Sequence, residues 1–66
     1  MNAFLKYRKD HRLTQERLAE LIGSTKASIC RYEKDKRVIS VDRAKVVNDK
    51  IGIPLHKLRP DVWEAA

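Results

Sequence analysis

Residues that start and stop helices recur at short intervals along this sequence. Thr14, Thr25 and Ser40 each precede a segment with helical character, and such side chains cap helix N-termini. Gly23 and Gly52 follow apolar stretches and suit the left-handed residue that often ends a helix. No segment alternates between apolar and polar residues over a convincing length, as a half-buried strand would. The pattern therefore predicts an all-α fold built of short helices.

Five helices are expected from these signals and from the spacing of apolar residues. The first four are expected over residues 3–10, 15–22, 26–34 and 41–51. Pro54 suits the first turn of a short fifth helix. Together these helices would form a compact bundle. The apolar stripes that would pack in its core are Phe4, Leu5 and Tyr7; Leu18, Leu21 and Ile22; and Ala44, Val47 and Ile51.

The length and the cysteine count limit what the chain can be. Sixty-six residues suit one domain, residues 1–66, with a core near the lower size limit for folding without disulfides or metal. The single cysteine excludes an internal disulfide, and no cysteine or histidine cluster has zinc spacing. No apolar run approaches the ~20 residues of a membrane span, and the first ten residues lack the apolar stretch of a signal peptide. We therefore expect a cytoplasmic protein with no cofactor, metal or membrane partner.

Side chains for catalysis are not grouped in this sequence. It holds no Ser/His/Asp arrangement, no glycine-rich phosphate loop and no paired carboxylates in a plausible cleft. Glu16 and Glu20 are spaced as ordinary solvated charges on one helix surface, and His11 and His56 have no nearby ligand partners in the sequence. We therefore do not expect an enzyme, and at this length we expect no second domain for a small-molecule effector.

Positive charge dominates the composition. Fifteen lysines and arginines against nine acidic residues give a formal net charge of +6, and the pI is about 9.8. Such a surface attracts nucleic acids or anionic membranes. A soluble protein that is merely cationic fits the composition as well, so charge alone leaves the partner open.

The segment from Ser24 to Arg37 is basic and nearly free of aliphatic residues. On a helix that begins at residue 26, Ile29 and Tyr32 share one face and would pack inward. Arginine and lysine on the opposite face can donate to guanine O6 and N7 or to phosphates. Two short helices joined by a tight turn, the second with this face, match a helix-turn-helix and its recognition helix. The outward face holds Lys26, Ala27, Cys30, Arg31 and Lys34.

The stretch from Leu13 to Arg37 resembles the helix-turn-helix of phage Cro and repressor-type DNA-binding proteins, the XRE-like family. The resemblance extends from Leu5 to about Leu58. The tail "LRPDVW" is similar to the end of small Cro-like, YdaS-type prophage regulators. The matching features are Arg8, "LTQ" before the second helix, Ala19, Gly23, Ile29, Glu33 and the closing "IGIPLHKL".

Three positions depart from the family pattern. Ser24 stands where an apolar residue often follows the turn glycine, so the turn is expected to pack less tightly. Asp35 stands where glycine is common. Aspartate tolerates a left-handed conformation at some cost, and it adds an acidic group near the expected phosphates. A proline that is usual near Ser40 is absent, but none of these differences argues against the fold.

The resemblance also implies roles for individual side chains. Gln15 would bind a phosphate through its side chain and nearby backbone N–H groups, where the helix dipole favours an anion. Arg8 and Glu33 would form an internal ion pair between the first and third helices. The residues implied at base edges in the major groove are Lys26, Ala27, Cys30 and Arg31, and those implied at the DNA backbone are Lys34, Lys36 and Arg37.

Each of these roles has a simpler alternative. Gln15 could be a solvated residue of the first helical turn, and the basic residues after the third helix could be a solvated charge run. Arg31 could contact a phosphate instead of a base. Cys30 could be an inert small side chain. Trp63 is expected to be a packing residue, largely buried against its own core or against a second subunit.

The implied function is that of a sequence-specific regulator that binds double-stranded DNA, as Cro-type phage or prophage repressors do. One recognition helix reads only a few base pairs, so we expect a dimer on a pseudo-palindromic operator. Its subunits would meet through the fourth and fifth helices and the tail, in a contact that is weak alone and strengthened on DNA. Two alternatives remain open: an antitoxin-like regulator whose main partner is a protein toxin, and a helix-turn-helix used only for protein interaction.

Overall fold

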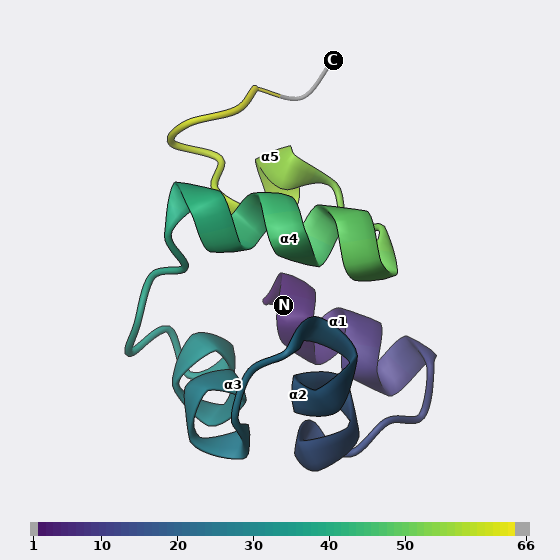
Figure 1. The fold of residues 1–66 in the computed structure, drawn as a ribbon. Helices are drawn as coiled ribbons and strands as arrows, with labels where there is room; N and C mark the ends of the chain where they lie inside the picture. Colours follow the sequence, from purple (N-terminus) through teal and green to yellow (C-terminus); the bar gives the residue numbers. More distant parts are fainter. Residues whose placement is uncertain (1, 65–66) are drawn as a thin grey trace.

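The computed structural model describes residues 2–64. It contains five α-helices: α1 (Ala3–Asp10), α2 (Gln15–Ile22), α3 (Lys26–Glu33), α4 (Val41–Ile51) and α5 (Leu55–Leu58). This part of the chain has no β-strand, so the all-α prediction is confirmed. Helices α2 and α3 lie together at one end of the molecule, and α4, α5 and the C-terminal tail lie at the other (Figure 1).

Side chains cap the N-termini of the first four helices, which satisfies backbone N–H groups that have no partner within the helix. Thr14, Thr25 and Ser40 each accept a hydrogen bond of 3.1 to 3.2 Å from the backbone N–H three residues ahead. Gly23 and Gly52 follow α2 and α4 with φ of 66° and 75°, the left-handed conformation. These five predicted helix ends are confirmed.

Two helix boundaries differ by one residue from the expected ones. Helix α3 ends at Glu33, and Lys34 is its C-cap. Pro54 precedes α5 instead of lying in its first turn, and its carbonyl accepts hydrogen bonds from the N–H groups of Lys57 and Leu58 at 3.0 and 3.3 Å. Proline suits this position too, because a residue before a helix uses its carbonyl and needs no N–H.

The core is small and draws on all of the longer helices. The largest fully buried side chains are Leu18 and Ile22 of α2, Ile29 of α3 and Val47 of α4. Helix α3 adds only one more buried residue, Tyr32, as its sequence predicts. Most of α3 is therefore left for contacts outside the core. The other buried residues are Phe4, Ala19, Ile39, Ala44 and Ile53.

The C-terminal tail folds back on the bundle. Arg59 Nη1 donates to the backbone oxygen of Ile39 at 2.9 Å, and its Nη2 pairs with Asp61 at 2.6 Å. Trp63 packs against the core of its own chain, as expected of a packing residue, but it is only partly buried. Among residues 2–64, no helix has the length and apolar character needed to cross a membrane.

Shortening a fully buried side chain of α3 should lower stability. We expect Ile29→Val to reduce the free energy of unfolding by about 0.5–1.5 kcal/mol. Each kcal/mol corresponds to roughly 4–8 °C in Tm for a domain of this size, so thermal unfolding measures the change. Val38→Ala is the control, because Val38 is 72% exposed and should tolerate the change. Equal losses in the two variants would contradict the burial of Ile29.

Candidate nucleic-acid interface

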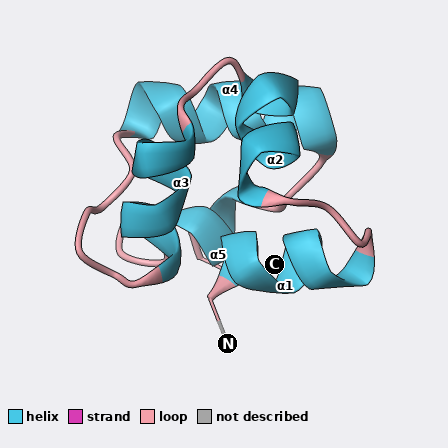
Figure 2. Cartoon of the chain, turned by 90° about the horizontal axis from the view of Figure 1, so that it is seen from below, coloured by secondary structure: helices cyan, strands magenta, loops and turns pink. Residues whose placement is uncertain are grey.

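The turn between α2 and α3 is tight and is held from two sides. Gly23 takes the left-handed conformation, and the half-buried Ser24 donates its backbone N–H to Ala19 O at 2.8 Å. Arg43 of α4 donates from Nη2 to Ile22 O at 2.9 Å, at the C-terminal end of α2. The turn therefore places α2 and α3 next to each other, in the arrangement of a helix-turn-helix (Figures 1 and 2).

The outer face of α3 is open along the helix. Ile29 and Tyr32 point into the core, whereas Lys26, Ala27 and Arg31 are exposed. Cys30 is half-buried and lies on the same side of the helix. The four residues implied at base edges thus share the side of α3 that faces away from the core.

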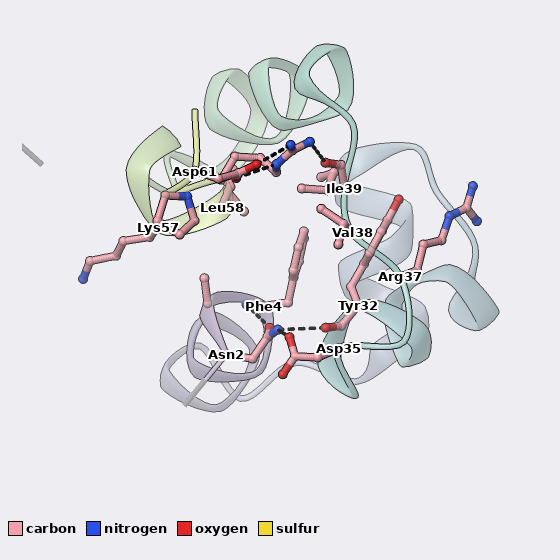
Figure 3. Close-up of a pocket in the computed structure, with 13 residues that line it drawn as sticks. Asn2, Phe4, Tyr32, Asp35, Arg37, Val38, Ile39, Lys57, Leu58 and Asp61 are labelled. Atoms are coloured by element: carbon pink, nitrogen blue, oxygen red, sulfur yellow. Dashed lines mark hydrogen bonds and ion pairs between the residues drawn. The ribbon is translucent and has the colours of Figure 1, made fainter. Parts of the chain in front are cut away.

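The loop after α3 carries the basic residues implied at the DNA backbone, all exposed: Lys34, Lys36 and Arg37. Asp35 takes a left-handed conformation there, with φ of 56°. Its carboxylate accepts a hydrogen bond from Asn2 Nδ2 at 3.0 Å, and the same nitrogen donates to Tyr32 O at 2.7 Å (Figure 3). The acidic group that the sequence placed near the phosphates is therefore engaged within the protein. Asn2, Tyr32 and Asp35 also line a hollow of about 300 Å³.

A bidentate ion pair joins α1 to α3. Arg8 Nε and Nη2 donate to Glu33 Oε2 and Oε1 at 2.8 and 3.0 Å, and Arg8 Nη1 donates to Leu13 O at 3.3 Å. The Glu33 side chain is only 6% exposed, and that of Arg8 is 24% exposed. Burial disfavours the ionised carboxylate, but hydrogen bonds from Arg8 and Gln15 outweigh it and hold the pKa of Glu33 below its usual value. The bond to Glu33 raises the pKa of Arg8.

Gln15 belongs to the same network. Its Nε2 donates to Glu33 Oε1 at 3.3 Å, so the residue implied at a phosphate is tied to the ion pair. Lys26 reaches this place from α3, with Nζ 3.7 Å from Glu16 Oε1. The structure thus brings Lys26, implied at base edges, beside a residue implied at the DNA backbone. A hollow of about 380 Å³ between the starts of α2 and α3 is lined by Arg8, Thr14, Gln15, Glu16 and Lys26.

The chemical groups that this surface offers are hydrogen-bond donors and cations. Amide, ammonium and guanidinium groups suit phosphate oxygens and the acceptor edges of bases.

The two histidines lie apart from these donors in their contacts: His11 stacks on Tyr7 with ring centres 4.0 Å apart, and His56 is half-buried. The described residues include no group of three or more His, Cys, Asp or Glu side chains placed as metal ligands.

Two residues that position the interface were not expected from the sequence. Asn2 caps α1, with Oδ1 accepting from Phe4 N at 2.8 Å, and it also joins α1 to the end of α3. An asparagine directly before an apolar helical segment is a recognisable cap signal. Arg43 carries no comparable signal, because the carbonyl of Ile22 that it holds lies 21 residues earlier in the chain.

A comparison with protein families agrees with this geometry. The model of the family described as helix-turn-helix matches residues 5–58, from α1 through α5. This chain belongs to the helix-turn-helix family. It is a DNA-binding protein of the Cro and XRE-like type, which confirms the family resemblance seen in the sequence. The helix-turn-helix match ends at Leu58, so tail residues 59–64 lie outside it. Comparisons with curated proteins and with solved structures gave no match.

Replacement of Glu33 by glutamine should destabilise the fold in a pH-dependent way. We expect a loss of about 2 kcal/mol near neutral pH, because a hydrogen bond to a charged group contributes roughly 1.5–3 kcal/mol. The pKa of Glu33 is lower in the folded chain than in the unfolded chain. Its stabilisation is therefore present above pH ~4.3 and lost as the pH falls through the folded-state pKa.

Chemical unfolding near neutral pH and again near pH ~3 tests this expectation. The difference between the wild type and Glu33→Gln should be smaller in acid. The pKa values of Asp10 and Asp61 are also lowered, by hydrogen bonds from Lys6 and Arg59. Both residues are present in the two proteins, so their contributions cancel in the difference. A stability difference that is the same at both pH values would contradict the pairing of Glu33.

Proposed function

We propose that this chain is a sequence-specific transcriptional regulator of the Cro type, a phage or prophage repressor that binds a pseudo-palindromic operator in double-stranded DNA as a dimer. One observation carries the proposal: α3 buries only Ile29 and Tyr32 and turns a polar, cationic face outward. The major groove is about 12 Å wide and admits one α-helix. Membership of the helix-turn-helix family supports this use of α3.

Arg31 is the leading base reader in this proposal. It is exposed in the second half of α3, and a guanidinium can donate two parallel hydrogen bonds to O6 and N7 of guanine. Ala27, about one turn earlier, has no donor but allows close approach and can pack on a thymine methyl group. Lys26 and Cys30 complete the proposed set of base contacts.

The DNA backbone would be held near both ends of α3. Gln15 lies at the start of α2 and lines one hollow with Lys26 at the start of α3. The N–H groups and the helix dipole at the start of α2 favour an anion. Arg37, beyond the end of α3, has its guanidinium 6.0 Å from the ring centre of Tyr32, at the edge of cation–π range. Lys34 and Lys36 precede it in the sequence. The formal net charge of +6 adds an attraction that is independent of sequence.

Dimerisation would double the number of base pairs that are read. A single recognition helix contacts too few of them to select one site among genomic competitors. The subunits would meet through α4, α5 and the tail, where Val62 is 45% exposed. An interface with so little exposed apolar surface is weak alone, so the dimer would form mainly on DNA. This function belongs in the cytoplasm and requires no catalysis, no membrane and no small-molecule effector.

Removal of the Arg31 side chain should change sequence preference as well as affinity. We expect Arg31→Ala to weaken binding to the best operator and to flatten the preference at one base pair in each half-site, by about 1–3 kcal/mol. The operator is obtained by selection from a random DNA pool. Equilibrium binding to it and to its single-base variants then measures both effects.

Lys36→Ala is the contrast for this experiment, because a phosphate contact carries no sequence information. It should weaken all operator variants alike and reduce the slope of log K against log salt concentration by about one for each bound subunit. If Arg31→Ala leaves the ranking of operator variants unchanged, Arg31 holds only the backbone and Lys26 becomes the leading base reader.

A further inference from the structure

Glu33 accepts more hydrogen bonds than its ion pair requires. Its side chain, 6% exposed, takes two from Arg8 and a third from Nε2 of Gln15 at 3.3 Å. One side chain from each of α1, α2 and α3 therefore meets at this carboxylate. Gln15 is the first residue of α2 and the only glutamine in the chain. A substitution at Glu33 should therefore alter the hydrogen bonding of Gln15 at the N-terminus of α2.

The two edges of the Gln15 amide differ in what they can bind. A glutamine amide carries two N–H donors on its nitrogen and an acceptor on its oxygen. A phosphate only accepts, so the amide must present an N–H to it. The Glu33 carboxylate also only accepts, so it attracts the amide nitrogen and repels the oxygen. One N–H of Gln15 then remains for a second acceptor.

The surroundings of Gln15 suit an anion. It lines the hollow of about 380 Å³ between α2 and α3 together with Arg8 and Lys26. The ammonium of Lys26 is 3.7 Å from Glu16, but the two side chains are 62% and 71% exposed. An exposed pair of this kind contributes little and can exchange partners. The start of α2 adds the positive end of a helix dipole.

We propose that Glu33 is a positioning residue for DNA binding: it sets the Gln15 amide so that the free N–H meets one backbone phosphate in this hollow. The inference rests on the proposed function and deepens it. The ion pair that joins α1 to α3 then also orients a contact with DNA. Arg8 acts one step further back, because it keeps Glu33 ionised and in place.

The test uses the tightest-bound duplex from a random pool, about two helical turns or ~20 base pairs long. Single phosphates in it are replaced in turn by neutral methylphosphonates. In the wild type, one replacement per half-site should weaken binding about tenfold, the scale of one charge-assisted hydrogen bond. Gln15→Ala should lose most of this sensitivity, and Glu33→Gln should lose it at the same phosphate.

Asn48→Ala is the matched control. Asn48 Nδ2 donates to Ile53 O at 2.9 Å, so its loss destabilises the fold outside the contacts of Gln15 and Glu33. With binding measured where each variant is folded, this control should keep the wild-type sensitivity at every phosphate. Glu33→Gln could also keep the wild-type sensitivity to the methylphosphonate while Gln15→Ala loses it. In that case Glu33 is not a positioning residue, and the proposed function stands. No binding of the wild type to any duplex would reject both.

A second measurement needs no substitution and therefore does not depend on a variant that folds. Nitrogen-15 labelling of the single glutamine gives one side-chain NH₂ group with two proton resonances. When the duplex is added, one resonance should move while the other, bonded to Glu33, keeps its position. If neither moves, or if both move together to the values of a free amide, the positioning role is overturned.

Discussion

Two parallel hydrogen bonds between Arg8 of α1 and Glu33 of α3 fix a helix that buries few side chains. Helix α3 has eight residues and buries only Ile29 and Tyr32. Burial of two such side chains contributes roughly 1.5–3 kcal/mol each, and a helix shorter than ~12 residues is marginal by itself in water. Apolar contacts do not fix the orientation of a helix, whereas three hydrogen bonds to one buried carboxylate do. The position of α3 relative to α1 and α2 therefore depends on Glu33.

Other polar contacts act at the two ends of α3. Arg43 holds the turn before it, through the carbonyl of Ile22, and Asn2 holds the last turn through the carbonyl of Tyr32. All of these contacts approach from the core side or from the helix ends. The outer face of α3 is used by none of them. A small fold thus holds α3 in place while the donors on its outer face stay exposed.

Helix ends could be predicted because each depends on one residue and its neighbours in the chain. Thr14, Thr25 and Ser40 cap the helices that follow them, and Gly23 and Gly52 take the left-handed conformation. Local spacing also placed the two inward side chains of α3. These features need no knowledge of which distant segments touch.

Contacts between distant segments could not be derived in this way. The Arg8–Glu33 pair was expected only through the family resemblance, since nothing within α1 or α3 shows the partner. Gln15 and Lys26 had separate implied roles, and only the fold shows that they line one hollow. The partial exposure of Trp63 could not be predicted either. Its aromatic side chain indicated packing, but how far it is buried depends on the path of the tail.

If α3 meets DNA with its outer face, the backbone amides of that helix must sense the duplex. The direct measurement is a map of amide resonances in the nitrogen-15-labelled protein, with and without the duplex selected from a random pool. We expect the largest shifts between Lys26 and Arg31, smaller shifts near Gln15 and Lys36, and little change in the second half of α4. Shifts concentrated in α4 and α5, with α3 unaffected, would contradict the use of α3 as the recognition helix.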